Sequence, residues 1–188
     1  IDCVSGVWAL AVLSDGRLAV GGVDIHVWLM TVGAGVEAAR AKLTGHGSVV
    51  AALAVLPDGT LASGSFDNTV RLWDVGARAC VATLAGHTGY IWALAVLADG
   101  RLASGSADNS VRLWDVGTRT CVGMLEGHTD RVWALAALPD GRLASGSTDK
   151  TIRVWDTRLA AAAVGGGTPV VVLEGHECAV VALQPLPG

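Results

Sequence analysis

Histidine, serine and aspartate, the residue types of a serine hydrolase triad, recur together three times in this chain at an interval of 41 residues. A triad needs one exposed nucleophilic hydroxyl, a histidine base and an oxyanion hole. Three copies at identical offsets indicate instead a structural role that is repeated along the chain. The sets are His46, Ser63 and Asp67, then His87, Ser104 and Asp108, then His128, Ser145 and Asp149.

The sequence around these sets repeats as well. Three stretches of thirty residues align without insertion, and each begins at Gly-His and ends at Trp-Asp: residues 45–74, 86–115 and 127–156. Self-similarity at this period predicts a repeat architecture, in which stacked units bury a core that no single unit can bury alone.

Each repeat predicts four short strands. A nearly continuous apolar run such as VWALAAL predicts an innermost strand that is buried on both faces and ends at Pro-Asp-Gly. RLASGS predicts a second strand, TIRVWD a third and CVGMLEG a fourth. Four strands in one repeat leave no room for a helix of useful length.

The pairing of Gly-His with Trp-Asp at a fixed separation resembles the WD40 repeat. The resemblance covers the three repeats, reaches a degenerate unit at 1–30 and extends to a terminal stub at 175–188. It implies an all-β fold, a WD40-type β-propeller with four recognisable four-stranded blades and the first strand of a fifth at 179–183. We expect one propeller domain with blades at about 1–44, 45–85, 86–126 and 127–174, and a partial blade at 175–188.

The resemblance also gives the recurring polar residues a role. In WD40 proteins a His, a strand Ser or Thr, a turn Asp and a strand Trp form a buried hydrogen-bond chain, which here implies that Trp73, Trp114 and Trp155 complete the three sets. Asp then accepts from His, His from Ser, and Ser from the indole N–H. Ser65 lies on the same side of an ideal strand as Ser63, so the sequence leaves open which of the two takes part.

Blade 1 departs from the pattern. Alignment of its inner strand places Cys3 at the His position, Val20 at the Ser position and Trp28-Leu29 at the Trp-Asp position, with a shortened turn at Asp24. We therefore expect a broken polar chain in an eroded terminal repeat, rather than a specialised blade.

The number of blades suggests that the chain is part of a larger propeller. Seven blades, the usual number in the family, would take about 290 residues at this period. The alternatives are a four-blade ring, or self-association of two chains into an eight-blade ring, because an unclosed propeller exposes a blade face and unpaired edges. In blade 4 the Ala- and Gly-rich segment 157–169 predicts an inserted loop on the rim.

Composition narrows the class of protein further. A net charge of −4 argues against a non-specific grip on nucleic acid, and no apolar run is long enough to cross a membrane. The four cysteines have no CxxC spacing, which predicts free thiols and an intracellular, cytoplasmic or nuclear protein. The histidines follow the repeat, and no phosphate-binding loop is present, so we expect no metal ion and no cofactor.

Candidate protein-binding residues lie near the starts of the inner strands. In WD40 propellers, side chains at these positions and just before the turn Asp lie on the narrow face where partners bind. Trp, Tyr and Arg also dominate interface hot spots, whereas the alternative is that these tryptophans fill space between blades. The candidates are Trp8, Phe66, Tyr90, Trp92, Arg131 and Trp133. We therefore expect a non-catalytic scaffold that binds other proteins or peptides.

A second function remains open. Residues 143–158 resemble the sixteen-residue WD box that docks substrate receptors to cullin-RING ubiquitin ligases, with Asp156 and Arg158 as possible contacts to the ligase adaptor. Ala144 departs from that box, which prefers a larger aliphatic residue there. Gly76 and Gly117 occupy the Arg position in the two preceding repeats.

Overall fold

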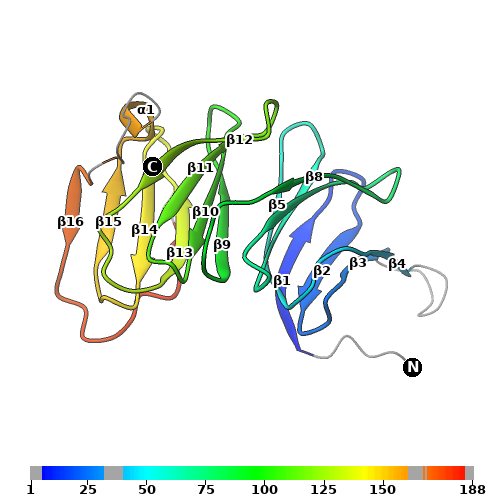
Figure 1. Ribbon diagram of the computed structural model, residues 1–188, viewed down its shortest axis with the longest axis horizontal. Coiled ribbons are helices and arrows are strands. Elements are labelled where there is room, and N and C mark those ends of the chain that lie inside the picture. The colour runs from blue at the N-terminus through cyan, green and yellow to red at the C-terminus, as the bar shows by residue number, and fades with distance from the viewer. Residues whose placement is uncertain (1–5, 32–39, 161–166, 168, 185–188) are drawn as a thin grey trace.

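The computed structural model describes residues 6–31, 40–160, 167 and 169–184. These residues form four antiparallel sheets of four strands each, together with one four-residue helix, α1 (Thr157–Ala160) (Figure 1). In every sheet the strands are paired in chain order, so each is a meander of hairpins. The expectation of an all-β fold built from four-stranded blades is confirmed.

The four sheets, here called blades 1 to 4, correspond to successive repeats. Blade 1 holds β1 (Val7–Val12), β2 (Leu18–Gly22), β3 (Val27–Met30) and β4 (Arg40–Leu43). Blade 2 holds β5 (Val50–Val55), β6 (Leu61–Ser65), β7 (Val70–Asp74) and β8 (Ala79–Leu84). Blade 3 holds β9 (Ile91–Val96), β10 (Leu102–Ser106), β11 (Val111–Asp115) and β12 (Thr120–Leu125). Blade 4 holds β13 (Val132–Ala137), β14 (Leu143–Ser147), β15 (Ile152–Trp155) and β16 (Val171–Leu173).

An Asp-Gly turn closes the first hairpin of each blade. In blade 2, Gly59 adopts a φ of 87°, a left-handed conformation that glycine tolerates best, and its N–H donates to the carbonyl of Leu56 over 2.9 Å. The carboxylate of Asp58 accepts from the N–H of Thr60 over 2.9 Å. These turns lie at the opposite end of the inner strand from the aromatic residues that begin it.

Consecutive blades stack through their inner strands. β5 packs against β1 on one side and β9 on the other, and β9 packs against β13. The second strand of each blade contributes a glycine to this joint: a Cβ built on Gly64 would lie 2.5 Å from Cγ2 of Ile91. The stacking therefore requires a residue without a side chain here, and it produces three separate apolar cores, one for each pair of consecutive blades.

The two outer blades leave one face open. Val7 in β1 is 51% exposed, whereas the equivalent Val50, Ile91 and Val132 are each 0% exposed. Leu173 in β16 is 48% exposed, against 2% for the equivalent Leu84. Within the described residues, blades 1 and 4 share no joint of the kind that links consecutive blades, and Figure 1 shows them at opposite ends of the arrangement.

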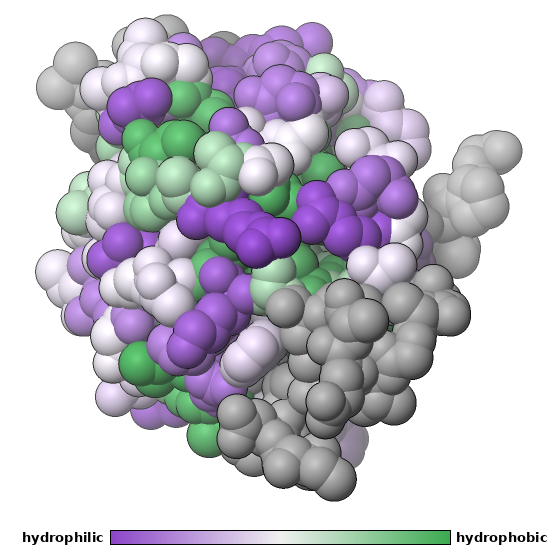
Figure 2. Space-filling model, turned by 90° about the vertical axis from the view of Figure 1, so that its right-hand side faces the viewer, coloured by the Kyte–Doolittle hydropathy of each residue, from purple (hydrophilic) through white to green (hydrophobic). Residues whose placement is uncertain are grey.

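Figure 2 views the molecule from the blade 1 side. Hydrophobic surface there is divided into several areas by hydrophilic residues. The exposed large apolar residues of β1 are Val7, Trp8, Leu10 and Val12, at 51%, 49%, 61% and 69%. The sequence prediction that inner strands are buried on both faces therefore fails for β1, because no preceding blade covers it in this structure.

The predicted alignment of blade 1 is wrong at its third strand. β2 pairs with β3 so that Leu18 lies opposite Met30 and Val20 opposite Trp28. In blade 2 the corresponding partners are Leu61 with Trp73. Met30 therefore occupies the position that Trp73 has in blade 2, and Trp28 occupies that of Arg71. The turn at Asp24 is as long as the equivalent turn of blade 2. Cys3, predicted at the His position, lies outside the described residues.

The segment expected to form the first strand of a fifth blade has no strand in the structure. Residues 179–183 pair with no second strand among the described residues, and a strand depends on such a neighbour for its hydrogen bonds. Val180 nevertheless packs against blade 4 in the way that Ile91, the first residue of β9, packs against blade 2. Its N–H donates to the carbonyl of Ser147 over 2.9 Å, and a Cβ built on Gly146 would lie 2.6 Å from its Cγ1.

The inserted segment of blade 4 is described only in part. It begins with α1, which contains Thr157, buried to 1% exposure. Residues 161–166 and 168, where the rim loop is predicted, lie outside the described residues.

Candidate functional site

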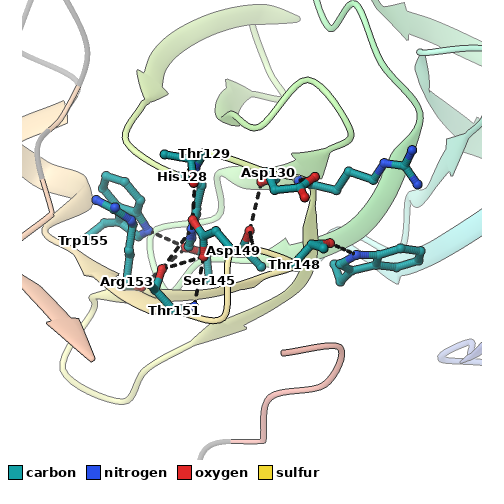
Figure 3. Close-up of polar contacts among 12 residues, drawn as sticks. His128, Thr129, Asp130, Ser145, Thr148, Asp149, Thr151, Arg153 and Trp155 are labelled. Atoms are coloured by element: carbon teal, nitrogen blue, oxygen red, sulfur yellow. Dashed lines mark hydrogen bonds and ion pairs between the residues drawn. The ribbon is translucent and has the colours of Figure 1, made fainter. Parts of the chain in front are cut away.

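The structure brings the predicted polar residues of blades 2, 3 and 4 into three matching chains. In blade 4, His128 Nδ1 lies 2.7 Å from Asp149 Oδ2, and its Nε2 lies 2.7 Å from Ser145 Oγ (Figure 3). The indole N–H of Trp155 donates to the same Ser145 Oγ over 2.8 Å. The corresponding distances in blades 2 and 3 are 2.7–2.8 Å. Each chain thus joins a loop, a turn and two strands.

The two serines of each second strand have different partners. Ser63 takes part in the chain of blade 2, whereas the Ser65 hydroxyl donates to the carbonyl of Ser48 over 3.2 Å and accepts from the N–H of Asp67 over 3.1 Å. Ser65 therefore fixes the turn that carries the aspartate. Both serines are fully buried, with 0% exposure.

The aspartates of these chains are held as carboxylates. Burial opposes ionisation of Asp67, but hydrogen bonds from Thr69, Gly47 and His46 outweigh it and lower its pKa to about 2. The pKa values of Asp108 and Asp149 are lowered for the same reasons. For His46 and His128, burial lowers the pKa of the imidazole despite the neighbouring aspartate. The neutral His therefore donates from Nδ1 and accepts from the serine at Nε2.

This arrangement does not present a nucleophile. Asp, His and Ser are connected in the order of a hydrolase triad, yet each serine hydroxyl is 0% exposed and lies under the indole that donates to it. A substrate carbonyl would have to displace the tryptophan to reach the oxygen. The geometry supports a structural role in holding each blade together.

Blade 1 replaces the chain with a local contact. The indole N–H of Trp28 donates to Asp24 Oδ2 over 2.9 Å. Val20 and Met30 stand where the other blades have Ser and Trp, so the inner part of the blade has apolar residues in place of the buried hydrogen bonds.

Five of the six predicted binding residues form one contiguous aromatic cluster, here called the narrow-end cluster. Phe66 stacks on Tyr90 at a centroid distance of 4.6 Å and meets Trp92 edge-on at 4.5 Å. Trp92 contacts Trp133 at 4.0 Å and Trp8 at 5.9 Å. Residues from four blades therefore converge where the inner strands begin.

Exposure within the narrow-end cluster is uneven. Trp8 is 49% and Tyr90 48% exposed, whereas Phe66, Trp92 and Trp133 are partly buried. Arg131, the sixth predicted residue, has an exposed side chain immediately before β13. The inner rings thus fill space between blades, whereas Trp8, Tyr90 and Arg131 form surface.

Trp92 and Trp133 differ in one hydrogen bond. The indole N–H of Trp133 donates to Thr148 Oγ1 over 2.6 Å (Figure 3). Ala107 occupies the equivalent place in blade 3, and the buried indole nitrogen of Trp92 has no hydrogen-bond partner. The sequence contains this signal, since Ala107 and Thr148 are one repeat apart.

The two predicted ligase contacts lie at the start of α1. Arg158 is exposed, and its Nε lies 3.2 Å from Asp156 Oδ1. The pair follows the end of β15 that lies opposite the narrow-end cluster, and the carbonyl of Thr157 between the two residues accepts from Arg101 of blade 3 over 3.1 Å.

A polar pocket at the opposite end of blades 1 and 2 was not predicted from the sequence. It has a volume of about 470 Å³ and is lined by the Asp-Gly turns of blades 1 and 2, by residues 74–76 at the end of β7, and by Val81 and Arg119. Its sequence signal is a substitution within the repeat: the turns of blades 1, 3 and 4 read Asp-Gly-Arg, whereas blade 2 reads Asp-Gly-Thr.

The described residues show no grouping of three or more metal-binding side chains. No helix among them has the length and apolarity required to pass through a membrane.

Four-stranded meanders stacked through their inner strands, three of them held by an Asp–His–Ser–Trp hydrogen-bond chain, define a propeller-type repeat protein. A family model described as "WD domain, G-beta repeat" matches residues 39–74, 78–115 and 119–156. The chain belongs to the WD40 family. Among curated proteins, none matches this chain. WD40 repeats generally mediate protein–protein interactions, and proteins of this family are typically non-catalytic.

Proposed function

We propose that this chain is a non-catalytic scaffold that assembles a complex by binding another protein or peptide at the narrow-end cluster. The observation that carries the proposal is the contact of five aromatic rings from four blades, with Trp8 and Tyr90 about half exposed. Large aromatic residues at the centre of a rigid surface are the usual anchors of protein interfaces.

The narrow-end cluster suits a rigid binding surface because its inner rings are already packed. Phe66 and Trp92 hold Tyr90 and Trp8 in place through ring contacts, so little side-chain freedom is lost when a partner binds. Arg131 and Asp130 add charged groups beside the rings, which supplies a polar rim.

The test is affinity capture with mass spectrometry from the source cells, comparing the native chain with a Trp8→Ser/Tyr90→Ser variant. Both side chains are about half exposed, so the fold should survive the changes. Val181→Ser is a matched control, because Val181 is 62% exposed and lies in the terminal stub. Partners that are lost only from the double variant support the proposal, and an unchanged set of partners would overturn it.

The second candidate function is a substrate receptor of a cullin-RING ubiquitin ligase. Its support is the exposed Arg158 side chain, 71% accessible, within the segment that resembles a WD box. Loss of ligase subunits from the capture with Arg158→Ala, while other partners remain, would favour this function. Absence of such subunits from every capture would eliminate it.

The open faces of blades 1 and 4 bear on domain organisation. The whole chain forms part of a single propeller in this proposal, completed by further blades or by self-association of two copies. Support comes from Val7 in β1, which is 51% exposed although its equivalents in blades 2 to 4 are fully buried. Sedimentation equilibrium of the chain and of Val12→Lys distinguishes the two cases, since only self-association makes the mass depend on this face.

The thiols favour an intracellular site of action, in the cytoplasm or nucleus. Cys80, Cys121 and Cys178 are free and exposed, which suits a reducing compartment.

A further inference from the structure

Blade 2 lacks an arginine that the other three blades share. In blade 1, Arg17 donates from Nε to Asp15 Oδ2 over 2.8 Å, and its Nη2 lies 2.6 Å from the same oxygen. Arg101 binds Asp99 and Arg142 binds Asp140 in the same way, with distances of 2.6–2.8 Å. Thr60 occupies this position in blade 2, so the turn that contains Asp58 supplies no arginine to pair with it.

The missing side chain would act on a second carboxylate as well. In blade 4, Asp140 and then Asp156 raise the pKa of Arg142, which places both carboxylates within electrostatic reach of one guanidinium. Asp74 is the blade 2 equivalent of Asp156. Because Thr60 is neutral, Asp58 and Asp74 both lack the cation that their counterparts have.

The polar pocket of about 470 Å³ lies at this position. Asp58, Thr60 and Asp74 line it, together with the ion pair of Asp15 and Arg17 and with Arg119 from blade 3. Among the described residues, neither Asp58 nor Asp74 has a cationic group within 4.0 Å. Three carboxylates against two guanidinium groups give the lining a formal charge of −1, which one added cation would neutralise.

The carboxylates keep acceptor capacity for such a cation. Asp58 Oδ1 accepts from the N–H of Thr60 over 2.9 Å, and Asp74 Oδ1 accepts from the N–H of Ala77 over 2.8 Å. Each therefore has a second oxygen available. A planar guanidinium can bind two oxygens at once: Arg101 donates from Nε to Asp99 Oδ2 over 2.8 Å and from Nη2 to the carbonyl of Thr157 over 3.1 Å.

We propose that this pocket, lined by Asp58, Thr60 and Asp74, binds an arginine side chain of a partner polypeptide, whose guanidinium occupies the place of the arginine that blade 2 lacks. The site is independent of the narrow-end cluster, since it lies at the other end of β1 and β5. It gives the scaffold a second interaction surface with a defined chemical preference.

The test uses the full chain and the probe Nα-acetyl-L-arginine N-methylamide, followed by amide chemical shifts in NMR titration. We expect saturable shifts at Gly59 and Gly76, beside the pocket, and none at Gly100 and Gly141, whose turns already hold an arginine. The neutral citrulline analogue should bind at least several-fold more weakly, because it cannot form the ion pair.

Two variants change the number of sites in opposite directions. Thr60→Arg should remove the shifts by filling the pocket from within, and it should fold because three equivalent turns carry the same sequence. Arg101→Thr should create a second set of shifts at Gly100. Asp58→Asn should weaken binding several-fold without altering the turn, since its amide oxygen can still accept from Thr60.

With the blocked amide and its analogue, each of three outcomes would overturn the proposal: no saturable shifts with the arginine amide, equal shifts with the citrulline analogue, or unchanged binding by Thr60→Arg. Free L-arginine is the remaining arm. Tighter binding of the free amino acid than of the blocked amide would show that the site takes a small molecule, and would overturn the assignment to a polypeptide side chain. None of these results depends on whether Trp8 and Tyr90 bind a partner.

Discussion

Trp133 donates its indole N–H to the hydroxyl of Thr148 over 2.6 Å, and this bond has no counterpart one repeat earlier. The tryptophan one repeat earlier is Trp92, which is otherwise equivalent to Trp133, and the two ring centroids lie 4.0 Å apart. The absence of a hydroxyl at Ala107, where blade 4 has Thr148, thus separates a fixed indole from one with a buried, unmatched donor.

Ala107→Thr should therefore stabilise the protein. The new hydroxyl gives the Trp92 N–H an acceptor, and a hydrogen bond of this kind contributes about 0.5–1.5 kcal/mol to the free energy of unfolding. Urea denaturation measures the effect. Ala107→Val has nearly the same shape without the hydroxyl, so a gain of equal size in both variants would show that packing, not the hydrogen bond, is responsible.

Ser104→Ala should destabilise blade 3 strongly. The change removes the acceptor of the Trp114 N–H and the donor to His87 Nε2, and it leaves two buried polar atoms without partners. The expected loss is about 2–4 kcal/mol in the free energy of unfolding. Thr118→Ala on the exposed β11–β12 turn is the control. A loss of unfolding free energy no larger than that of the control would mean that the hydrogen-bond chain does not hold blade 3 together.

The stability of the fold should decrease as the pH falls below about 6.5. The folded-state pKa values of His46 and His128 lie below the ordinary 6.5, so the unfolded chain takes up protons first and is favoured. Asp67, with a pKa of about 2 against 3.8, adds a second loss as the pH falls from about 4 toward 2.

Chemical denaturation at a series of pH values checks this prediction. His46→Gln should reduce the difference in the free energy of unfolding between pH values above and below the ordinary histidine pKa. His176→Gln should not, because His176 is exposed in the stub. A profile that is identical for the native chain and His46→Gln would contradict the assignment.

The same substitution should have different costs in the first and fourth blades. Val132→Ala removes a fully buried side chain from the joint between blades 3 and 4, and should cost about 2 kcal/mol. Val7→Ala should cost less than about 0.5 kcal/mol, since Val7 is 51% exposed. Both are measured by urea denaturation at a concentration where the chain is monomeric. Equal costs would mean that another surface covers β1.

The interior of blades 2 to 4 could be predicted from the sequence because the repeats give identical residues identical neighbours. Blade 1 could not, since matching Trp28 to Trp73 by residue type overrode the strand lengths, which place Met30 there. The sequence also could not show that Ser63 and Ser65 have different partners. That distinction depends on which loop crosses the strand, and the Ser48 carbonyl reaches only one of them.

The polar pocket illustrates a different reason. Thr60 is an unremarkable residue for a turn, and only the three ion pairs of its counterparts reveal what it lacks. The members of the narrow-end cluster could be predicted from the sequence because aromatic residues stand out at the start of the inner strands. The exposure of each ring could not, because it depends on contacts between blades that are not adjacent in sequence, such as that of Trp8 with Trp92.

The joints between blades also set an order of opening. Among the described residues, blades 2 and 3 are held on both faces, whereas blade 1 is held on one, and blade 4 has only the Val180 stub on its outer face. In a linear array each lost joint removes one increment of free energy, so the ends should separate first. Amide hydrogens in β6 and β10 should accordingly exchange with solvent last, and those in β2 should exchange while the centre of the array is still closed.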